Sequence, residues 1–230
     1  MTDKNKRPGK YFYQSQLFRK IAAEDPVVLI DVGARGGIHP KWRPLHGVIK
    51  AIGFEPDADE CRRLNEAAVN NHTYFPVALF NKKGKVNINM TREPVCSSIL
   101  EPNHALLNRF LASEEFEVTG SIEVTCDSLD GIVQNNGIKD IDFIKLDTEG
   151  AEYDILLGAK KVLSQSVFGI SLEMLFNRQR IGEPLFSEID LFLREQGFVV
   201  YDLPIFRCAR TVLSPHMFSD NAGPTDHGQA

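Results

Sequence analysis

The stretch "VVLIDVGARGGIHPKW", residues 27–42, begins with four aliphatic residues, reaches an acid at Asp31 and then places three glycines within five positions. The aliphatic run predicts a buried strand, and the glycines predict a tight turn directly after it. Ligands of open α/β sheets bind beyond the carboxyl ends of the strands. Asp31 therefore stands where such a sheet would hold a cofactor.

Further apolar runs of strand length follow, and amphipathic helical patterns separate them. Asp57 and Glu60 have the spacing of a capping box, which predicts a helix from there to about Ala68. Pro184 and Gly197 mark the two ends of another helix. We therefore predict an α/β fold, a three-layer αβα sandwich around a mostly parallel sheet. The remaining strands are expected at residues 48–54, 73–78, 141–146, 168–174 and 198–203, and the apolar stripe of one more helix at Ile155, Leu156, Ala159, Val162 and Leu163.

Residues 82–126 break this alternation. "GKVNINM" and "SIEVTC" alternate apolar and polar residues, which predicts antiparallel strands with one exposed face. The residues between them read as loop plus helix, so we expect an insertion between the third and fourth core strands. We predict one domain over 25–214, a helical or flexible N-terminal extension over 1–24 and a flexible C-terminal tail over 215–230.

The composition narrows the classes of function. The chain has 230 residues, 43% of them hydrophobic and 25% charged, and a formal net charge of −5, which argues against nucleic acid as a partner. Four cysteines without a CxxC pair indicate a reducing compartment. No signal-peptide pattern and no long apolar run occurs, so we expect a cytoplasmic protein without a membrane partner. The oligomeric state stays open.

The sequence of the glycine turn distinguishes between two candidate cofactors. A dinucleotide fingerprint needs glycines at relative positions 1, 3 and 6, but counting from Gly33 the other two positions hold Arg35 and Ile38. An acid at position 31 would also repel a pyrophosphate. S-adenosylmethionine offers the opposite chemistry, a cationic ammonium, a cationic sulfonium and a ribose diol without phosphate. The sequence therefore favours S-adenosylmethionine over NAD.

Acids follow three of the expected strands, at Asp31, Glu55 and Asp147. Asp31 can anchor the glycine turn or meet the ammonium, and the two oxygens of Glu55 can accept from both ribose hydroxyls. Asp57 has the alternative role of a helix cap. The predicted cofactor-binding residues are Asp31, Gly33, Ala34, Gly37, Glu55, Pro56, Asp57, Val77, Ala78 and Asp147, with Val77 and Ala78 beside the adenine.

A family signature runs through the same residues. "LIDVGARGG", "GFEPD", "PVALFNKKG" and above all "DFIKLDTEGAEYDILLGA" resemble the FkbM family of S-adenosylmethionine-dependent methyltransferases. The resemblance implies a class I fold with a seven-stranded sheet, whose closing hairpin would come from 198–203 and 207–213. It also implies methylation of a hydroxyl on a sugar, glycan or small natural product. Arg35 and Thr148 depart from the residues common in the family.

Methyl transfer to oxygen needs alignment and benefits from a general base. Asp147, Glu149 and Glu173 are the predicted catalytic candidates, and His39 is a rival base. His39, Ser97 and Ser98 are predicted to contact a small-molecule or carbohydrate acceptor. Mg²⁺ on Asp147, Glu173 and Asn177 is possible but not favoured, so no metal site is predicted. Two alternatives remain: a cofactor-binding domain of the same fold without activity, and an NAD-dependent oxidoreductase.

Overall fold

The computed structural model describes residues 15–68 and 71–205, and these form two compact units. The first, here the sheet unit, takes the chain up to Lys85, Val124–Thr148 and Asp154–Glu173. The second, here the hairpin unit, takes Val86–Glu123, Glu149–Tyr153 and the residues from Met174 on. The predicted segments 1–14, 207–213 and 215–230 lie outside the described residues.

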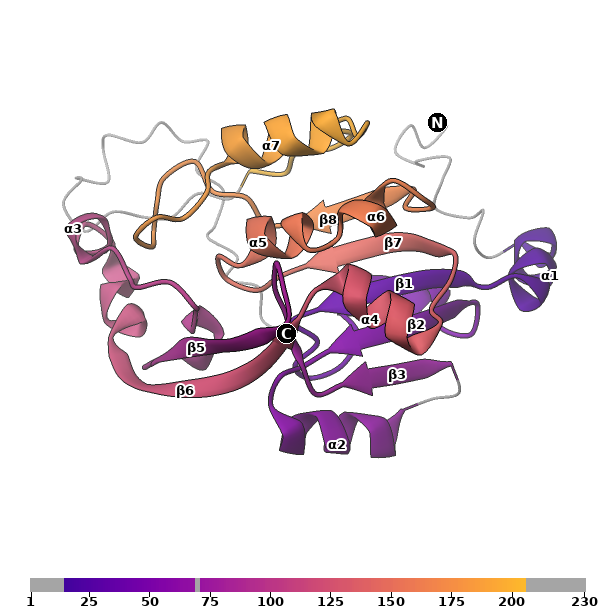
Figure 1. The fold of residues 1–230 in the computed structure, drawn as a ribbon, viewed down its shortest axis with the longest axis horizontal. Coiled ribbons are helices and arrows are strands. Elements are labelled where there is room, and N and C mark those ends of the chain that lie inside the picture. Colours follow the sequence, from indigo (N-terminus) through magenta and orange to yellow (C-terminus); the bar gives the residue numbers. More distant parts are fainter. Residues whose placement is uncertain (1–14, 69–70, 206–230) are drawn as a thin grey trace, which may run out of the picture. The chain divides into compact units, whose positions relative to one another are not determined.

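The sheet unit is built on five parallel strands in the order β3-β2-β1-β7-β8 (Figure 1). The three central strands, β2, β1 and β7, consist mainly of apolar residues and are largely buried, which is typical of strands covered on both faces, whereas the edge strands β3 and β8 are more exposed. The prediction of a mostly parallel α/β sheet is therefore confirmed. The strands are β1 (Val27–Val32), β2 (Ile49–Phe54), β3 (His72–Phe75), β7 (Ile141–Leu146) and β8 (Gly169–Leu172).

One row of residues crosses all five strands in register. Its members are Tyr74 on β3, Gly53 on β2, Asp31 on β1, Lys145 on β7 and Ser171 on β8. Residues paired in register point to the same face of a sheet. The last three members, here the polar row, therefore project side by side near the carboxyl ends of their strands.

Two segments cover the face to which this row belongs. They are α2 (Ala58–Ala67) and the 3-10 helix η2 (Pro40–Leu45). Cys61 and Leu64 of α2 pack with Leu29 and Ala51 of the sheet, and Trp42 of η2 meets the Phe143 ring edge-on at 4.9 Å. Figure 1 shows α2 running along β3. The remaining helices that contribute to this unit are α1 (Gln16–Glu24), α4 (Leu129–Asn136), α5 (Glu152–Leu157) and α6 (Lys160–Leu163).

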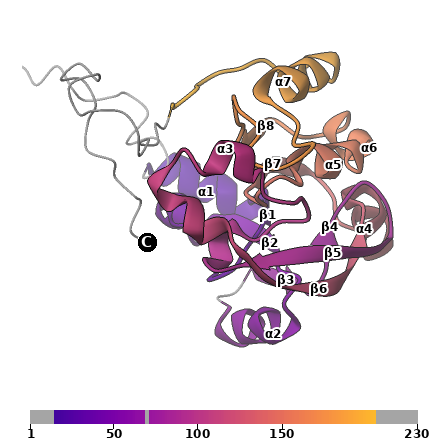
Figure 2. The same ribbon diagram turned by 90° about the vertical axis from the view of Figure 1, so that its left-hand side faces the viewer.

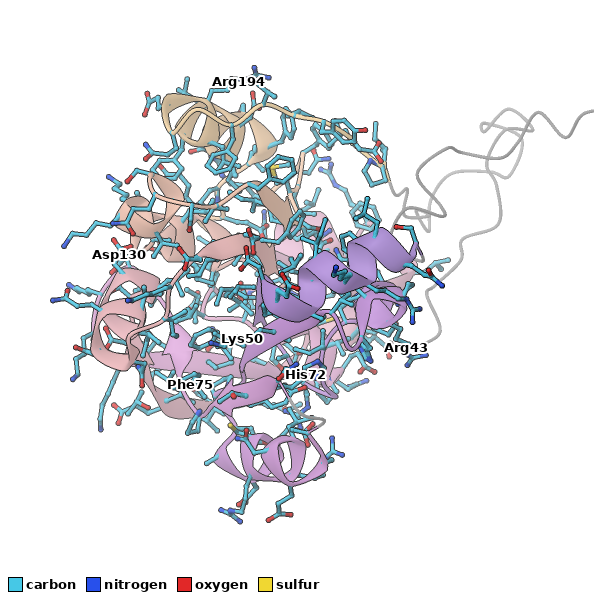
Figure 3. The ribbon with its side chains drawn as sticks, turned by 90° about the vertical axis from the view of Figure 1, so that its right-hand side faces the viewer. Arg43, Lys50, His72, Phe75, Asp130 and Arg194 are labelled. Atoms are coloured by element: carbon cyan, nitrogen blue, oxygen red, sulfur yellow. The ribbon has the colours of Figure 1, made fainter. Side chains whose placement is uncertain are left out.

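The predicted stripe after residue 150 is buried at every position, but it lies on two helices. The chain breaks between α5 and α6 at Gly158, where a Cβ atom would lie 2.2 Å from the Phe80 carbonyl oxygen. Asp130 on α4 (Figure 3) accepts hydrogen bonds from the N–H groups of Lys161 and Val162 and so caps α6. Backbone contact therefore divides the single helix that the periodicity predicts.

Two strand predictions need correction. The strand expected at 73–78 ends at Phe75, because Pro76 has no N–H for a ladder, and Ala78–Leu79 (β4) joins a separate sheet. The segment 198–203 forms no strand, although its residues are apolar. Val199 is 76% exposed and Tyr201 fully exposed, and this segment pairs with no strand among residues 15–68 and 71–205. The described residues therefore show five strands in the main sheet, and a count of seven is not confirmed.

The hairpin unit contains β5 (Gly84–Thr91) and β6 (Val118–Asp127), which run side by side in Figures 1 and 2. Bonds from Arg92 N to Glu117 O and from Thr119 Oγ1 to Met90 O show that the two strands are antiparallel, as predicted. The far end of β6 lies in the sheet unit and pairs with β4. The connecting residues form η3 (Pro94–Cys96), α3 (His104–Leu107) and η4 (Leu111–Phe116), and α7 (Phe186–Glu195) follows later.

The helix predicted between Pro184 and Gly197 is α7. Ile189 and Phe192 of its apolar stripe are buried, and Gly197 ends it with a φ of +91°. No helix within the described residues combines the length and the apolar character that crossing a bilayer requires.

Candidate functional site

The glycine turn after β1 lies against the end of β7. Gly33 has a φ of +75°, and a Cβ atom at this position would lie 2.1 Å from the Asp147 carbonyl oxygen. Only glycine tolerates both the left-handed backbone and this close approach. Gly36 and Gly37 also have positive φ values, and Ala34 between them and Gly33 is fully buried. Gly33 is therefore required for packing the two strand ends together, whereas Gly36 and Gly37 are favoured by their backbone conformation.

Asp31 closes this turn from inside the protein. It is fully buried, its Oδ2 accepts a hydrogen bond of 2.8 Å from His39 N, and its Oδ1 lies 3.1 Å from Lys145 Nζ. Burial raises the pKa of Asp31, and the charge of Lys145 opposes that shift. Of the two roles predicted for Asp31, the structure supports anchoring of the turn.

Lys145 was not among the predicted site residues. Its ammonium group is buried between Asp31 and Asp147, with Nζ 3.2 Å from Asp147 Oδ2 and 3.5 Å from Val32 O. The side chain of Asp147 is 44% exposed, whereas that of Asp31 has no exposed surface. Of the two acids that share this lysine, Asp147 is the one that a bound molecule can reach.

The second acid-bearing strand end is organised by Glu55. The residue is 4% exposed, and its Oε1 accepts a hydrogen bond of 2.9 Å from Asp57 N. Burial raises the pKa of Glu55, and the bond from Asp57 opposes the shift. Asp57 itself caps α2, because its Oδ1 accepts from the N–H groups of Asp59 and Glu60. The cap alternative for Asp57 is confirmed, and a ribose contact for Glu55 stays a prediction.

Glu60 does not complete the capping box that its spacing predicts. The N–H group of Asp57 is already bonded to Glu55, and Glu60 Oε1 instead accepts a hydrogen bond of 2.9 Å from Gly36 N in the glycine turn. Arg63 donates to both oxygens of Glu60, and these bonds lower the pKa of Glu60 to about 2. Arg35, the departure noted in the turn, lies 3.6 Å from Asp57. Helix α2 therefore holds the turn from outside.

The predicted adenine contacts lie beyond β3. Val77 N bonds to Phe75 O, and Ala78 begins β4, so the chain turns sharply after Pro76. Phe75 (Figure 3) stacks on Phe54 with ring centroids 5.5 Å apart. A role for Pro56, Val77 and Ala78 in cofactor binding stays a prediction.

His39 is the cap of η2. Its Nδ1 accepts a hydrogen bond of 3.2 Å from Lys41 N, so the neutral ring carries its proton on Nε2. Burial, followed by repulsion from Lys145, lowers the pKa of His39 below its usual 6.5. In this arrangement the Nε2 atom is a donor, and the roles of His39 as rival base and in acceptor binding stay predictions.

Asp147 and Glu173 follow the neighbouring strands β7 and β8, and a carboxylate oxygen of one lies within 4.8 Å of one of the other. Two carboxylates at this separation are donors that Mg²⁺ accepts. Lys145 already compensates one of these charges from 3.2 Å, which weakens the case for a cation. The expectation that these residues hold no metal stays a prediction.

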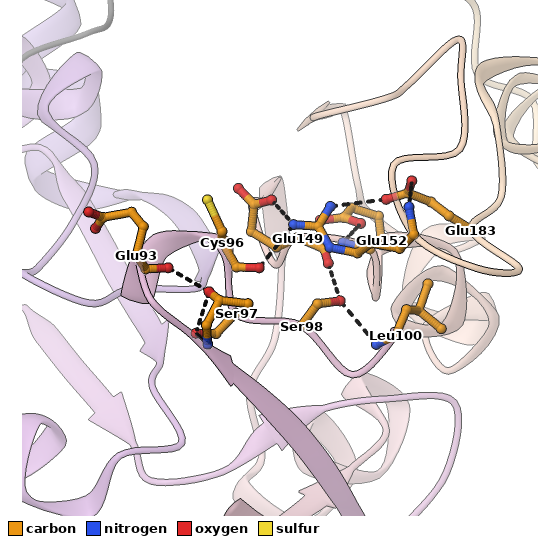
Figure 4. A network of polar contacts seen from close by, with 11 residues as sticks. Glu93, Cys96, Ser97, Ser98, Leu100, Glu149, Glu152 and Glu183 are labelled. Atoms are coloured by element: carbon orange, nitrogen blue, oxygen red, sulfur yellow. Dashed lines mark hydrogen bonds and ion pairs between the residues drawn. The ribbon is translucent and has the colours of Figure 1, made fainter. Parts of the chain in front are cut away.

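In the hairpin unit, Glu149 has a left-handed backbone with a φ of +58°, which is uncommon for a residue other than glycine. Ser98 Oγ donates a hydrogen bond of 2.6 Å to Glu149 O, and the carboxylate of Glu149 bonds to the guanidinium of Arg180 (Figure 4). These two contacts hold the strained residue in place.

Arg180 is buried between two carboxylates and was also missed by sequence reasoning. It pairs with Glu183 at 3.2 Å in addition to Glu149, and it donates to Cys96 O. Burial raises the pKa of Glu183, and Arg180 opposes the shift. An isolated bridge between Pro102 and Arg180 brings the arginine into this position. Its partners come from three separate segments of the chain, so no local sequence pattern predicts the role of Arg180.

Both serines predicted to bind the acceptor are engaged within the protein. Ser98 is 3% exposed and accepts from Leu100 N as well as donating to Glu149 O. Ser97 Oγ accepts from Thr91 N at 3.2 Å. The structure gives Ser98 the role of supporting Glu149 because its hydroxyl is buried and bonded. Acceptor binding by Ser97 stays a prediction.

Comparison with known proteins assigns the chain to a family. Residues 31–200 match the family described as the Methyltransferase FkbM domain. A 2-O-methyltransferase NoeI from Sinorhizobium fredii is 26% identical over 164 residues, which cover 66% of this chain and 65% of that protein. A crystal structure of Methyltransferase FkbM from Methylobacillus flagellatus aligns with 61% of this chain and 31% of its own, at 18% identity and a TM-score of 0.37.

Proposed function

Because the chain belongs to the FkbM family of methyltransferases, we propose that it transfers the methyl group of S-adenosylmethionine to a hydroxyl group on a sugar, glycan or small natural-product acceptor. The relative described as a 2-O-methyltransferase supports oxygen as the acceptor atom. The match spans less than two thirds of that relative, so substrate and activity of this chain are part of the proposal.

The residues present suit this cofactor. The observation that carries the proposal is the glycine turn, packed onto the end of β7 at Gly33 and closed by the buried carboxylate of Asp31. Glu55 at the end of β2 would hold the ribose hydroxyls, and Gly37 lies in the turn that would receive the methionyl part. The acidic side chains favour the cationic groups of the cofactor and disfavour a pyrophosphate.

When bound, the cofactor supplies a methyl group that a sulfonium centre has activated. The residues of the chain align an acceptor hydroxyl with it, and alignment contributes on the order of 7 to 11 kcal/mol in well-oriented reactions. Asp147 is the leading base, because its exposed carboxylate lies at the end of β7 and Lys145 fixes its orientation. It would accept the hydroxyl proton as the new oxygen–carbon bond replaces the carbon–sulfur bond, with S-adenosylhomocysteine as the leaving group. Glu149 and Glu173 are the other candidates for this step.

Calorimetric titration with S-adenosylmethionine and S-adenosylhomocysteine tests the binding half of the proposal. Glu55→Gln should weaken the binding of both compounds by about 10- to 100-fold, because a charge-assisted hydrogen bond contributes about 1.5 to 3 kcal/mol. Glu66→Gln makes the same chemical change at an exposed position of α2 and serves as the control. Binding of NAD in place of both compounds would overturn the proposal.

The chemical half needs an acceptor screen. Transfer of radiolabelled methyl groups into glycans and hydroxylated metabolites should be detected with the wild-type protein and lost in Asp147→Asn with cofactor affinity retained. Tight cofactor binding without transfer to any acceptor would favour a binding domain without activity. Full turnover by Asp147→Asn would remove Asp147 as the base.

A further inference from the structure

Lys41 is a cation without an anionic partner at the edge of the candidate site. It lies on η2, and its Nζ donates a hydrogen bond of 2.6 Å to Ser171 Oγ. It forms no ion pair with any carboxylate among the residues that the structure describes. The arrangement therefore leaves an ammonium group without a direct ion pair beside the polar row.

The surroundings of Lys41 are those of the cofactor turn. Ser171, which accepts the hydrogen bond from Lys41, belongs to the polar row. It lies in register with Lys145, which in turn lies in register with Asp31. Burial of the ammonium group and repulsion from Lys145 lower the pKa of Lys41, while Asp31 and Asp147 oppose the shift. The residue as a whole is exposed, so its charged end remains accessible to a bound molecule.

The charges around the row also balance in a specific way. Asp31 and Asp147 carry two negative charges, and Lys145 between them carries one positive charge. Lys41 brings the group of four to neutrality. A ligand with both an ammonium and a carboxylate would meet an acid on one side and a cation on the other, which is the complement of an amino-acid moiety.

Ser171 adds a second donor. Its oxygen accepts the hydrogen bond from Lys41, so its own hydroxyl proton is left to donate to another group. The backbone of Lys41 is held as well, because its N–H group donates to His39 Nδ1. An ammonium and a hydroxyl fixed side by side form a two-point site for one carboxylate.

We propose that Lys41 and Ser171 bind the α-carboxylate of the methionyl part of S-adenosylmethionine. This inference rests on the proposed function, because it assigns a part of the cofactor that the acidic residues cannot bind. It makes Lys41 the residue that distinguishes the intact cofactor from analogues without a carboxylate.

Decarboxylated S-adenosylmethionine provides the test, since it lacks only the group in question. Calorimetric titration should show that the wild-type protein binds S-adenosylmethionine at least tenfold more tightly than the decarboxylated compound. Lys41→Met should weaken binding of the intact cofactor by the same factor and change binding of the decarboxylated compound less than twofold. Ser171→Ala should show the same pattern with a smaller loss, about threefold. Lys50→Met, at an exposed position of β2, should bind both compounds like the wild type.

Three results would count against the inference. If Lys41→Met weakens the binding of both compounds equally, or of neither, the carboxylate lies elsewhere and this inference alone is overturned. Equal affinity of the wild-type protein for the two compounds would also overturn it. If the wild-type protein binds neither compound, the proposed function fails and the inference fails with it. Circular dichroism of each variant confirms that the fold is retained.

Discussion

Two buried cations, Lys145 in the sheet unit and Arg180 in the hairpin unit, each lie between two carboxylates, but different kinds of backbone place them. Lys145 sits within β7 and meets an acid on the neighbouring strand and another two residues further along its own chain. Arg180 lies outside regular strands and meets Glu149 and Glu183 from loops. The sheet fixes the first arrangement through register, whereas the second depends on one isolated bridge and on the ion pairs themselves.

This difference has an energetic consequence. Removing one partner of a buried ion pair leaves an uncompensated charge, which is costly unless the group changes its protonation. In the sheet unit the strands persist without Lys145, because apolar residues on both faces hold them. In the hairpin unit the guanidinium itself joins segments around Cys96, Glu149 and Glu183. We therefore expect the hairpin unit to be the more sensitive to loss of its cation.

The largest effect is expected for Arg180→Met. The change leaves Glu183 buried without its partner and should lower the free energy of unfolding by about 3 to 5 kcal/mol, measured by urea denaturation. Arg194→Met is the matched control, because Arg194 pairs with Asp190 at an exposed position of α7, where loss of a pair changes stability by less than about 1 kcal/mol. Equal losses of stability in the two variants would show that the hairpin unit does not depend on its buried cation.

A somewhat smaller loss is expected for Lys145→Met, about 3 kcal/mol by the same measurement, because a buried charge again loses its partner. Asp31 then loses the charge that opposes its raised pKa, so its pKa should rise further. Since an acid with a raised pKa in the folded state favours folding at low pH, the deficit of the variant should grow as the pH rises from 4 to 7. A deficit that is constant over this range would contradict the role assigned to Asp31.

The smallest effect is expected for Glu60→Gln. The change removes the negative charge of the carboxylate that accepts a hydrogen bond from Gly36 N. The loss should be about 1 kcal/mol at pH 7, the usual contribution of one hydrogen bond. The pKa of Glu60 is about 2 in the folded protein against 4.5 for the free group, so its contribution is complete above pH 4.5 and falls as the pH is lowered toward 2. Urea denaturation between pH 3 and 7 should therefore show the two proteins converging on the acid side. Parallel curves would show that Glu60 acts without its charge.

Much of the sheet could be predicted from the sequence, because burial on both faces demands unbroken apolar runs. The strands at 27–32 and 141–146 were predicted to the residue for this reason. The segment 198–203 has the same composition but no strand, since an apolar run forms a ladder only where a neighbour lies in reach. Local pattern carries no information about that neighbour.

The candidate site was predictable only where a residue follows its strand. Asp31, Glu55 and Asp147 are at strand ends as predicted, because turn chemistry is local. Lys145 and Ser171 depend on the register of β7 and β8 against their neighbours, which the sequence does not state. Glu60 was assigned to the wrong partner, because Glu55 had already satisfied the N–H group of Asp57. Competition among nearby groups decides such bonds.

The approach of Gly33 to the Asp147 carbonyl has a mechanical consequence. With a notional Cβ only 2.1 Å from that oxygen, there is no space in which one loop could slide past the other. Displacement of the glycine turn by an arriving molecule would therefore push directly on the backbone that carries the Asp147 carboxylate. Binding at the turn and orientation of the acid would then be a single event, transmitted by contact without a hinge.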